Sequence, residues 1–259
     1  MKQISLLIVI LTLILSACSQ ETTAPPLSKD EIIKKMQRSV KGIDSVTLSA
    51  QSDVMVTYDK FTTKFSQETD SQFDTINKSA LRILAHSNNA KYPVQSIIFN
   101  MDKGNVTAFP EPQYLNYRAR NADIQYFSTI QSDMVNLTGI IQNVVKKESE
   151  HVKVTDNTLH FEGKSPSLKH LFEYGNDFSS MNQIALFNGL TDIKVTSGRY
   201  DITLSPKQKL PKVLYFELKV EAKIKNKPVN FIMKQETKYK DFNITNVKSY
   251  EEKDIEGDK

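Results

Sequence analysis

Apolar and polar residues alternate along several stretches of this chain, a spacing that puts every second side chain on the same face of a β-strand. One long stretch covers residues 46–58, the clearest covers Lys212–Ile224, and a third follows the turn at residues 226–228. Each strand has one apolar face, which predicts a sheet with one side in water and the other side covered. The apolar positions are Val46, Leu48, Ala50, Val54, Val56 and Tyr58, then Leu214, Phe216, Leu218, Val220, Ala222 and Ile224, then Val229, Phe231 and Met233.

Helical spacing appears in four other places. Ser28 can cap a helix over residues 29–41, because Glu31 lies three residues later and can complete a capping box. Gly42 is placed to end that helix. The other three helices are expected over residues 132–147, 165–174 and 180–188. The helix over 165–174 has a proline in its opening residues, and Gly175 is expected to close it.

Shorter apolar segments separated by turn residues predict the remaining strands. Asp156-Asn157 is expected to form a hairpin turn, and Gly198 is expected to mark a bulge where the strand pattern changes parity. Because short turns join neighbours, the strands are expected to pair antiparallel in an α+β fold whose sheet is covered by the helices. The expected strands are Phe61–Ser66, Lys78–Leu84, Ser96–Met101, Val106–Phe109, Tyr114–Arg118, Val152–Thr155, Thr158–Phe161, Ile193–Thr196 and Tyr200–Leu204.

The first 18 residues follow a different pattern from the rest of the chain. Lys2 precedes an apolar run from Ile4 to Leu15, and small residues follow this run. That arrangement is typical of a secretory signal. A helix of this length reaches only about 18 Å, whereas the hydrocarbon core of a bilayer is about 30 Å thick. We therefore expect a cleaved signal rather than a permanent membrane span.

The tetrapeptide Leu15-Ser16-Ala17-Cys18 resembles the bacterial lipobox. The resemblance implies transfer of a diacylglycerol, carrying acyl chains such as palmitate, to the Cys18 thiol and cleavage before this residue. Cys18 is the only cysteine of the chain. Two or more acyl chains make anchoring stable, so the expected location is the extracytoplasmic face of the cell membrane. The expected parts are a signal peptide (1–17), a lipidated tether (18–27), a single domain (28–250) and a charged tail (251–259).

Composition narrows the class of partner. The chain has 34 basic and 30 acidic residues and a net charge of +4, without a run of five basic residues. Nucleic-acid binders usually concentrate positive charge on one face, so a nucleic-acid partner is not expected. A lone cysteine cannot form an internal disulfide, so the apolar core is expected to stabilise the domain, with 13 Phe and 10 Tyr to fill it.

No catalytic signature is present in the sequence. There is no His-Glu-x-x-His pair, no Gly-x-Ser-x-Gly elbow and no Ser-x-x-Lys motif, and the eight glycines are isolated. His151 and His160 lie on the two arms of one predicted hairpin, but two ligands do not make a zinc site. We therefore expect a protein that is not an enzyme and that holds no metal and no cofactor.

The order of elements resembles the LolA/LppX-like lipoprotein-carrier superfamily, including uncharacterised lipoproteins of Gram-positive bacteria. The lipobox, the helix at Asp30–Met36 leading into a strand at Asp44–Leu48, and a late hairpin from Tyr200–Leu204 through Leu210–Lys212 carry the resemblance. It covers most of residues 28–245 in pattern, without a specific short motif. It implies a strongly curved antiparallel sheet, a half-barrel, with helices on its concave face. Some members bind lipids or acyl chains there, and no family site residue transfers to this sequence.

Together these features predict binding of a lipid or another hydrophobic ligand between sheet and helices. The candidate ligand residues are Phe216, Leu218, Val220, Phe231 and Met233. Two interpretations of them stay open, because they can line a pocket or pack against the helices as a dry core. The alternative function is a non-catalytic accessory lipoprotein that binds a protein partner at the cell envelope. A hydrolase with an unrecognised site is a third hypothesis.

Overall fold

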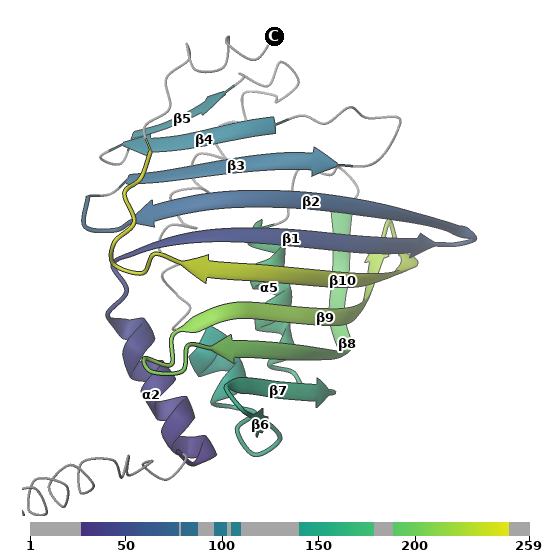
Figure 1. The fold of residues 1–259 in the computed structure, drawn as a ribbon. Helices are drawn as coiled ribbons and strands as arrows, with labels where there is room; N and C mark the ends of the chain where they lie inside the picture. The colour runs from purple at the N-terminus through teal and green to yellow at the C-terminus, as the bar shows by residue number, and fades with distance from the viewer. Residues whose placement is uncertain are drawn as a thin grey trace, which may run out of the picture.

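The computed structural model describes residues 27–77, 79–87, 96–102, 105–109, 140–178 and 189–248. Within them, ten strands form one open antiparallel sheet in the order β5-β4-β3-β2-β1-β10-β9-β8-β7-β6 (Figure 1). The strands are β1 (Ser45–Tyr58), β2 (Phe61–Asp74), β3 (Ser79–Ser87), β4 (Ser96–Asp102), β5 (Asn105–Phe109), β6 (Lys153–Thr155), β7 (Thr158–Gly163), β8 (Leu190–Leu204), β9 (Pro211–Ile224) and β10 (Lys227–Lys240). The predicted α+β class is confirmed in this coarse form, an open antiparallel sheet with few helices.

The strands that come first and last along the chain, β1 and β10, are neighbours at the centre of the sheet. β1 pairs with β10 from Thr47↔Lys240 to Tyr58↔Val229, and each of them also pairs with the strand next to it in sequence. Two meanders, β1 to β5 and β6 to β10, therefore join along this one long seam. Strand β2 extends eight residues beyond the predicted Phe61–Ser66, to Asp74. Polar residues occupy both faces of this extension, so the sequence has no alternation there to reveal it.

Helix α2 (Lys29–Lys41) begins and ends where the sequence predicts. The backbone N–H of Glu31 donates to Ser28 Oγ (3.3 Å), and the backbone N–H of Ser28 donates to Glu31 Oε2 (2.8 Å), which completes the capping box. Gly42 is the C-cap residue, with a φ of −100°. The apolar side of the helix is buried through Ile32, Ile33, Met36 and Val40. Figure 1 shows α2 at one end of the sheet.

Helix α5 (Leu168–Phe178) lies against one face of the sheet, and its placement corrects one prediction. Gly175 does not end this helix but lies inside it. A Cβ atom at Gly175 would stand 2.6 Å from Met233 Cε and 2.6 Å from Phe216 Cζ. The glycine is therefore present for close packing against the sheet rather than for a helix end. Helix α5 also begins at Leu168, three residues after the predicted start at Ser165.

The bulge expected at Gly198 lies two residues earlier in the strand. Val195 pairs with Val220, and Ser197 pairs with Lys219, so Thr196 is the extra residue of β8. Gly198 itself stays in register opposite Leu218. A bulge bends its strand and increases the local twist. Strand β8 accordingly changes direction along its length, as Figure 1 shows.

The other predicted elements fall partly outside the described residues. Of the expected helix over 132–147, the structure describes Ile140 onward and contains a π-helix, η1 (Ile141–Val145), with buried Ile141, Val144 and Val145. The predicted hairpin around Asp156-Asn157 is confirmed, with Asp156 at a φ of 54°. The predicted strand Tyr114–Arg118, the predicted helix 180–188 and the charged tail lie outside the described residues.

Candidate functional site

The face of the sheet that packs against α5, called here the inner face, carries the five predicted ligand residues. Phe216, Leu218 and Val220 alternate along β9, and Phe231 and Met233 alternate along β10. The strand register brings them together, because Phe231 lies opposite Val220 and Met233 lies opposite Leu218. None of the five exposes more than 2% of its surface. Alternation in the sequence therefore predicted which face of each strand is buried, and the strand register brings the five residues together.

Contacts with α5 account for part of this burial. The ring of Phe172 lies 5.8 Å from the ring of Phe231, measured between centroids. Gly175 lies over Phe216 and Met233, as described above. At these contacts the inner face is packed protein, which agrees with the dry-core interpretation of the residues beneath α5.

Polar side chains cross the inner face in a second region, which we call the polar belt: Ser52, Gln67, Thr69, Ser71, Gln235 and Thr237. Each of them is buried. Ser52 Oγ donates to Gln235 Oε1 (2.9 Å), and Gln235 Nε2 donates to Thr237 Oγ1 (2.9 Å). Gln67 Nε2 donates to Thr69 Oγ1 (3.2 Å). The inner face is thus apolar across β8 and β9 and partly polar across β2, β1 and β10.

Three buried tyrosines, Tyr174, Tyr200 and Tyr239, differ in how their hydroxyls are bonded. The hydroxyls of Tyr174 on α5 and Tyr239 on β10 are hydrogen-bonded to each other. Burial raises the pKa of Tyr239 well above its ordinary value, and the neighbouring Tyr174 raises it further. The Tyr200 hydroxyl is also buried, but it has no hydrogen-bond partner among the described residues. Burial raises the pKa of Tyr200 as well, and the negative charge of Glu148 adds to the effect.

Glu148 organises the start of α5. Its carboxylate accepts hydrogen bonds from Ser165 Oγ and from Ser167 Oγ (2.9 Å). Ser165 Oγ in turn accepts from the backbone N–H of Ser167 (3.1 Å). These bonds hold in place the segment that leads from β7 into α5.

A pocket of about 650 Å³ opens where α5 begins. One wall is the segment Lys164–Lys169, and the other wall is the stretch of β8 from Ile193 to Thr196. Strand β7 pairs with β8 only from Gly198 to Thr203. Among the described residues, the stretch before Gly198 therefore has a paired strand on its β9 side only, and the pocket lies along its other edge.

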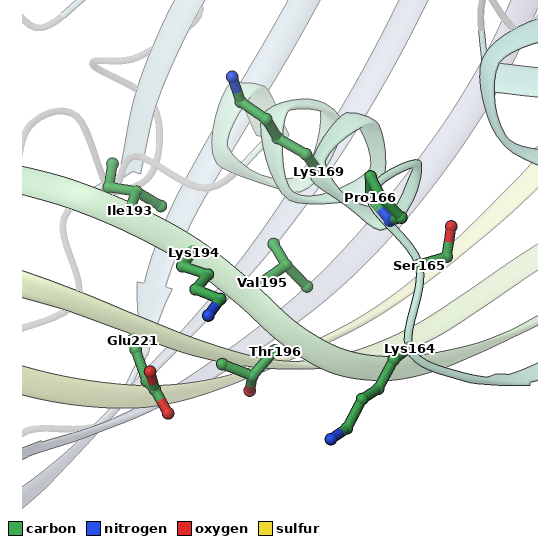
Figure 2. Close-up of a pocket in the computed structure, with 9 residues that line it drawn as sticks. All are labelled: Lys164, Ser165, Pro166, Lys169, Ile193, Lys194, Val195, Thr196 and Glu221. Carbon is green, nitrogen blue, oxygen red and sulfur yellow. The ribbon is translucent and has the colours of Figure 1, made fainter.

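The two sides of this edge pocket differ in chemistry. In Figure 2, Ile193 and Val195 project from β8 toward α5, whereas Lys164 and Lys194 project away from α5. Ile193 is 40% exposed. The pocket is apolar toward the inner face and basic at its rim, a combination that suits a ligand with an apolar part and a polar part.

Comparison with known proteins yields only distant likenesses. No protein-family model and no curated protein sequence matches this chain. Lipovitellin, solved in a study of its lipid–protein interactions, is similar with a TM-score of 0.32 and 11% identity over 81% of this chain and 26% of that chain. The chain therefore spans about a quarter of the length of lipovitellin.

Two smaller proteins match over most of both chains. A LolA superfamily protein from Nitrosomonas europaea has a TM-score of 0.21, with 9% identity over 88% of this chain and 97% of that chain. A DUF1329 family protein from Desulfovibrio piger has a TM-score of 0.22 and 7% identity over the same shares. TM-scores this low establish no shared function, so the proposals below depend on the geometry of this chain.

The remaining predicted positions are not brought into a site. Cys18 lies outside the described residues. His160 Nδ1 lies 2.6 Å from Asp201 Oδ1, and His151 is an exposed residue before β6. Within the described ranges, no three His, Cys, Asp or Glu residues come together in a way that could hold a metal ion. The helices described there include none with the length and apolar character needed to cross a bilayer.

Sequence reasoning missed the polar belt and the edge pocket. A signal for the belt was available in the sequence. Ser52 stands among the apolar every-second positions of β1, and Gln235 is the next every-second position after Met233 in β10, so both fall on the apolar face. The pocket had no such signal. It depends on where β7 ends beside β8, which is a matter of strand pairing rather than of local pattern.

Proposed function

We propose that this protein is a lipid-anchored lipoprotein of the extracytoplasmic membrane face that binds a lipid or another hydrophobic ligand between its sheet and its helices. The length of the inner face carries the proposal. Strands β1, β9 and β10 have 14 residues each, and α5 has 11 residues. Such strands are about 46 Å long, whereas such a helix is about 16 Å long. The inner face therefore extends well past α5 and offers a long track, which is apolar along β9 and mixed apolar and polar along β1 and β10.

The edge pocket connects this track to solvent. Ile193 and Val195 continue the inner face to the edge of β8 that pairs with no other described strand, where the pocket opens. A ligand can enter there without separating paired strands. In this proposal the role of the protein is to bind and not to catalyse.

The proposal includes a finer description of the fold. The sheet is a curved half-barrel with helices on its concave face, and the chain is a divergent member of the LolA/LppX-like superfamily. The bulge at Thr196 supports curvature, because bulges bend the strands that contain them. The sequence resemblance supports the membership through the order of elements.

The anchor supports the same role. Lipid at Cys18 and a tether of nine residues, 19–27, leave the domain within about 30 Å of the membrane surface. A domain that exchanges ligands with a bilayer needs this proximity. The signal layout and the position of the lone cysteine support this placement.

Native mass spectrometry of the full-length protein, purified from membranes in a mild detergent, tests the binding function. We expect co-purified lipid that is released on unfolding, and saturable binding of a fluorescent fatty acid to the lipid-free protein. Absence of both would refute the function.

A matched pair of variants locates the ligand. Ile193 on the pocket and Met55 on the opposite face of the sheet are each 40% exposed. We expect Ile193→Glu to weaken binding of the fluorescent fatty acid at least about tenfold, because a carboxylate beside an apolar chain is poorly solvated. Met55→Glu adds the same charge at the same exposure and is expected to leave binding unchanged. Equal effects of the two substitutions would place the ligand elsewhere.

One observation favours the second candidate function, binding of a protein partner. Ile76 and Ile244 expose 71% and 78% of their surfaces. Both belong to turns held at the same end of the sheet, because the backbone N–H of Thr75 donates to Asp44 O (2.9 Å) and Asn243 Oδ1 accepts from Asp44 N (2.7 Å). A photo-crosslinking amino acid at position 76 tests this candidate. One defined envelope protein captured from intact cells would favour it, and capture of lipid alone would oppose it.

A further inference from the structure

The rim of the edge pocket is positively charged. Three lysines line it, Lys164 before α5, Lys169 in α5 and Lys194 in β8. Glu221 is the one acidic side chain among the nine described lining residues. It lies directly opposite Lys194 on β9, so it offsets one of the three charges. The rim therefore keeps an excess of two positive charges around an opening of about 650 Å³.

The lysines are available to a ligand to different degrees. Lys169 Nζ lies 3.4 Å from Glu173 Oε1, an exposed pair one helical turn apart. Exposed pairs of this kind are weak, so a ligand anion can replace the partner. Lys164 and Lys194 form no ion pair within 4.0 Å with any residue that the structure describes.

The apolar and basic parts of the pocket have a fixed order. Ile193 and Val195 point toward α5 and the inner face, while Lys164 and Lys194 stand on the outer side of the same strand edge (Figure 2). A ligand that passes this edge meets Lys164 and Lys194 at the entrance and the apolar residues on the inside, while Lys169 extends from α5 on the other side (Figure 2). Its charged group must therefore be at one end of an apolar chain.

We propose that the edge pocket holds the anionic head of a single- or double-chain amphiphile, with Lys164 and Lys194 beside the carboxylate or phosphate, Lys169 on the α5 wall adding to the positive charge of the pocket, and the chain directed past Ile193 and Val195. The inference rests on the proposed ligand-binding function and narrows its ligand class to anionic amphiphiles. Neutral lipids lack the group that these lysines attract, and small anions lack the chain that the inner side of the pocket accepts.

Photo-crosslinking in isolated membranes that contain the full-length protein tests the inference. The probes are a diazirine fatty acid and the diazirine fatty alcohol of the same chain length, and labelling per protein is measured after illumination. The variant K164Q/K169Q/K194Q removes the three rim charges. The matched control, K34Q/K35Q/K41Q, removes three exposed lysines from α2, which do not line the pocket. Thermal unfolding of each variant verifies the fold.

We expect the fatty acid to label the wild-type protein about tenfold more than the rim variant, since each exposed ion pair contributes a factor of a few. The control variant should match the wild type, and the alcohol should label all three proteins equally. The label of the acid should map to the two walls, residues 163–169 and 190–198. High salt should reduce labelling by the acid and leave labelling by the alcohol unchanged, a result that needs no variant.

Other outcomes overturn the inference in distinguishable ways. If acid and alcohol label the wild type and the rim variant alike, the lysines select no anion, while binding of a hydrophobic ligand stands. If unlabelled acetate competes as well as unlabelled fatty acid does, the pocket takes small anions and not amphiphiles. If neither probe labels the wild type above heat-unfolded protein, the ligand-binding function fails together with the inference.

Discussion

At the scale of single residues, glycine at two positions lets elements pack closely on the inner face. A Cβ atom at Gly198 would stand 2.6 Å from Leu218 Cδ2 and 2.8 Å from the backbone oxygen of Glu217. Gly175 is as confined, between Met233 and Phe216. These glycines are therefore part of the packing between α5 and the sheet. At Gly42, by contrast, an added Cβ atom would meet no described atom within 4 Å.

Replacement of Gly175 by alanine is expected to destabilise the protein by about 1–3 kcal/mol, because the added methyl group overpacks a filled core. Urea denaturation measures the change in the free energy of unfolding. Gly42→Ala is the control, since its φ of −100° suits any residue and its surroundings are open. A Gly175→Ala variant as stable as Gly42→Ala would contradict the packing of α5 described here.

Removal of two buried tyrosine hydroxyls, one at a time, is expected to have different effects on the stability of the protein. Tyr200→Phe deletes a hydroxyl that has no hydrogen-bond partner among the described residues, so we expect stability unchanged or raised by up to about 1 kcal/mol. Tyr239→Phe breaks the hydrogen bond to Tyr174 and is expected to lower stability by about 1–2 kcal/mol. Thermal unfolding of both variants checks the pair. A loss for Tyr200→Phe as large as that for Tyr239→Phe would mean that the Tyr200 hydroxyl is bonded.

At the scale of elements, local signals set the ends of α2. Ser28 and Glu31 are joined by three hydrogen bonds. The bonds that the Ser28 hydroxyl (2.8 Å) and then the Ser28 backbone N–H donate to the Glu31 carboxylate lower the pKa of that carboxyl. These bonds satisfy backbone N–H groups that a helix start otherwise leaves to water. The result is an element that the sequence defines without help from the sheet.

Ser28→Ala is expected to cost about 1 kcal/mol of stability, the usual effect of losing a helix cap. The midpoint of thermal unfolding is the measurement. Ser49→Ala, at an exposed position of β1 on the outer face, is the control and is expected to change stability little. No difference between the two variants would show that α2 is held by packing alone.

At the scale of the whole molecule, the two meanders meet along the β1–β10 seam, so the N-terminal helix is attached to the centre of the sheet and not to a free edge. The chain before α2 leads to Cys18 through the short tether. Anchoring at Cys18 would therefore hold the entire sheet near the membrane through its most extensively paired strand.

Cys18→Ser in the full-length protein is expected to move the protein from the membrane fraction to the soluble fraction of bacterial cells, because the thiol that receives the lipid is gone. Immunoblotting of the fractions, together with the mass of the mature N-terminus, checks this. Ser19→Ala is the control and should remain in the membrane fraction. Retention of Cys18→Ser in membranes would refute the lipid anchor.

Elements with local signals could be predicted from the sequence. The capping box defined the start of α2, and strict alternation indicated β1, β9 and β10 together with their buried faces. Alternation determines which side of a strand is apolar, so the five ligand candidates were placed on the correct face. It does not determine whether such residues contact a ligand or a helix.

Features that depend on distant parts of the chain became visible in the three-dimensional fold. Gly175 has the local appearance of a helix end, but contact with Met233 and Phe216, some 40 to 60 residues away, makes it a packing position. The bulge is at Thr196 rather than at Gly198 because the register with β9 places it there. The edge pocket exists because β7 stops at Gly163 while β8 continues. Pairing partners and close contacts between distant segments are not encoded in local periodicity, and these set the site.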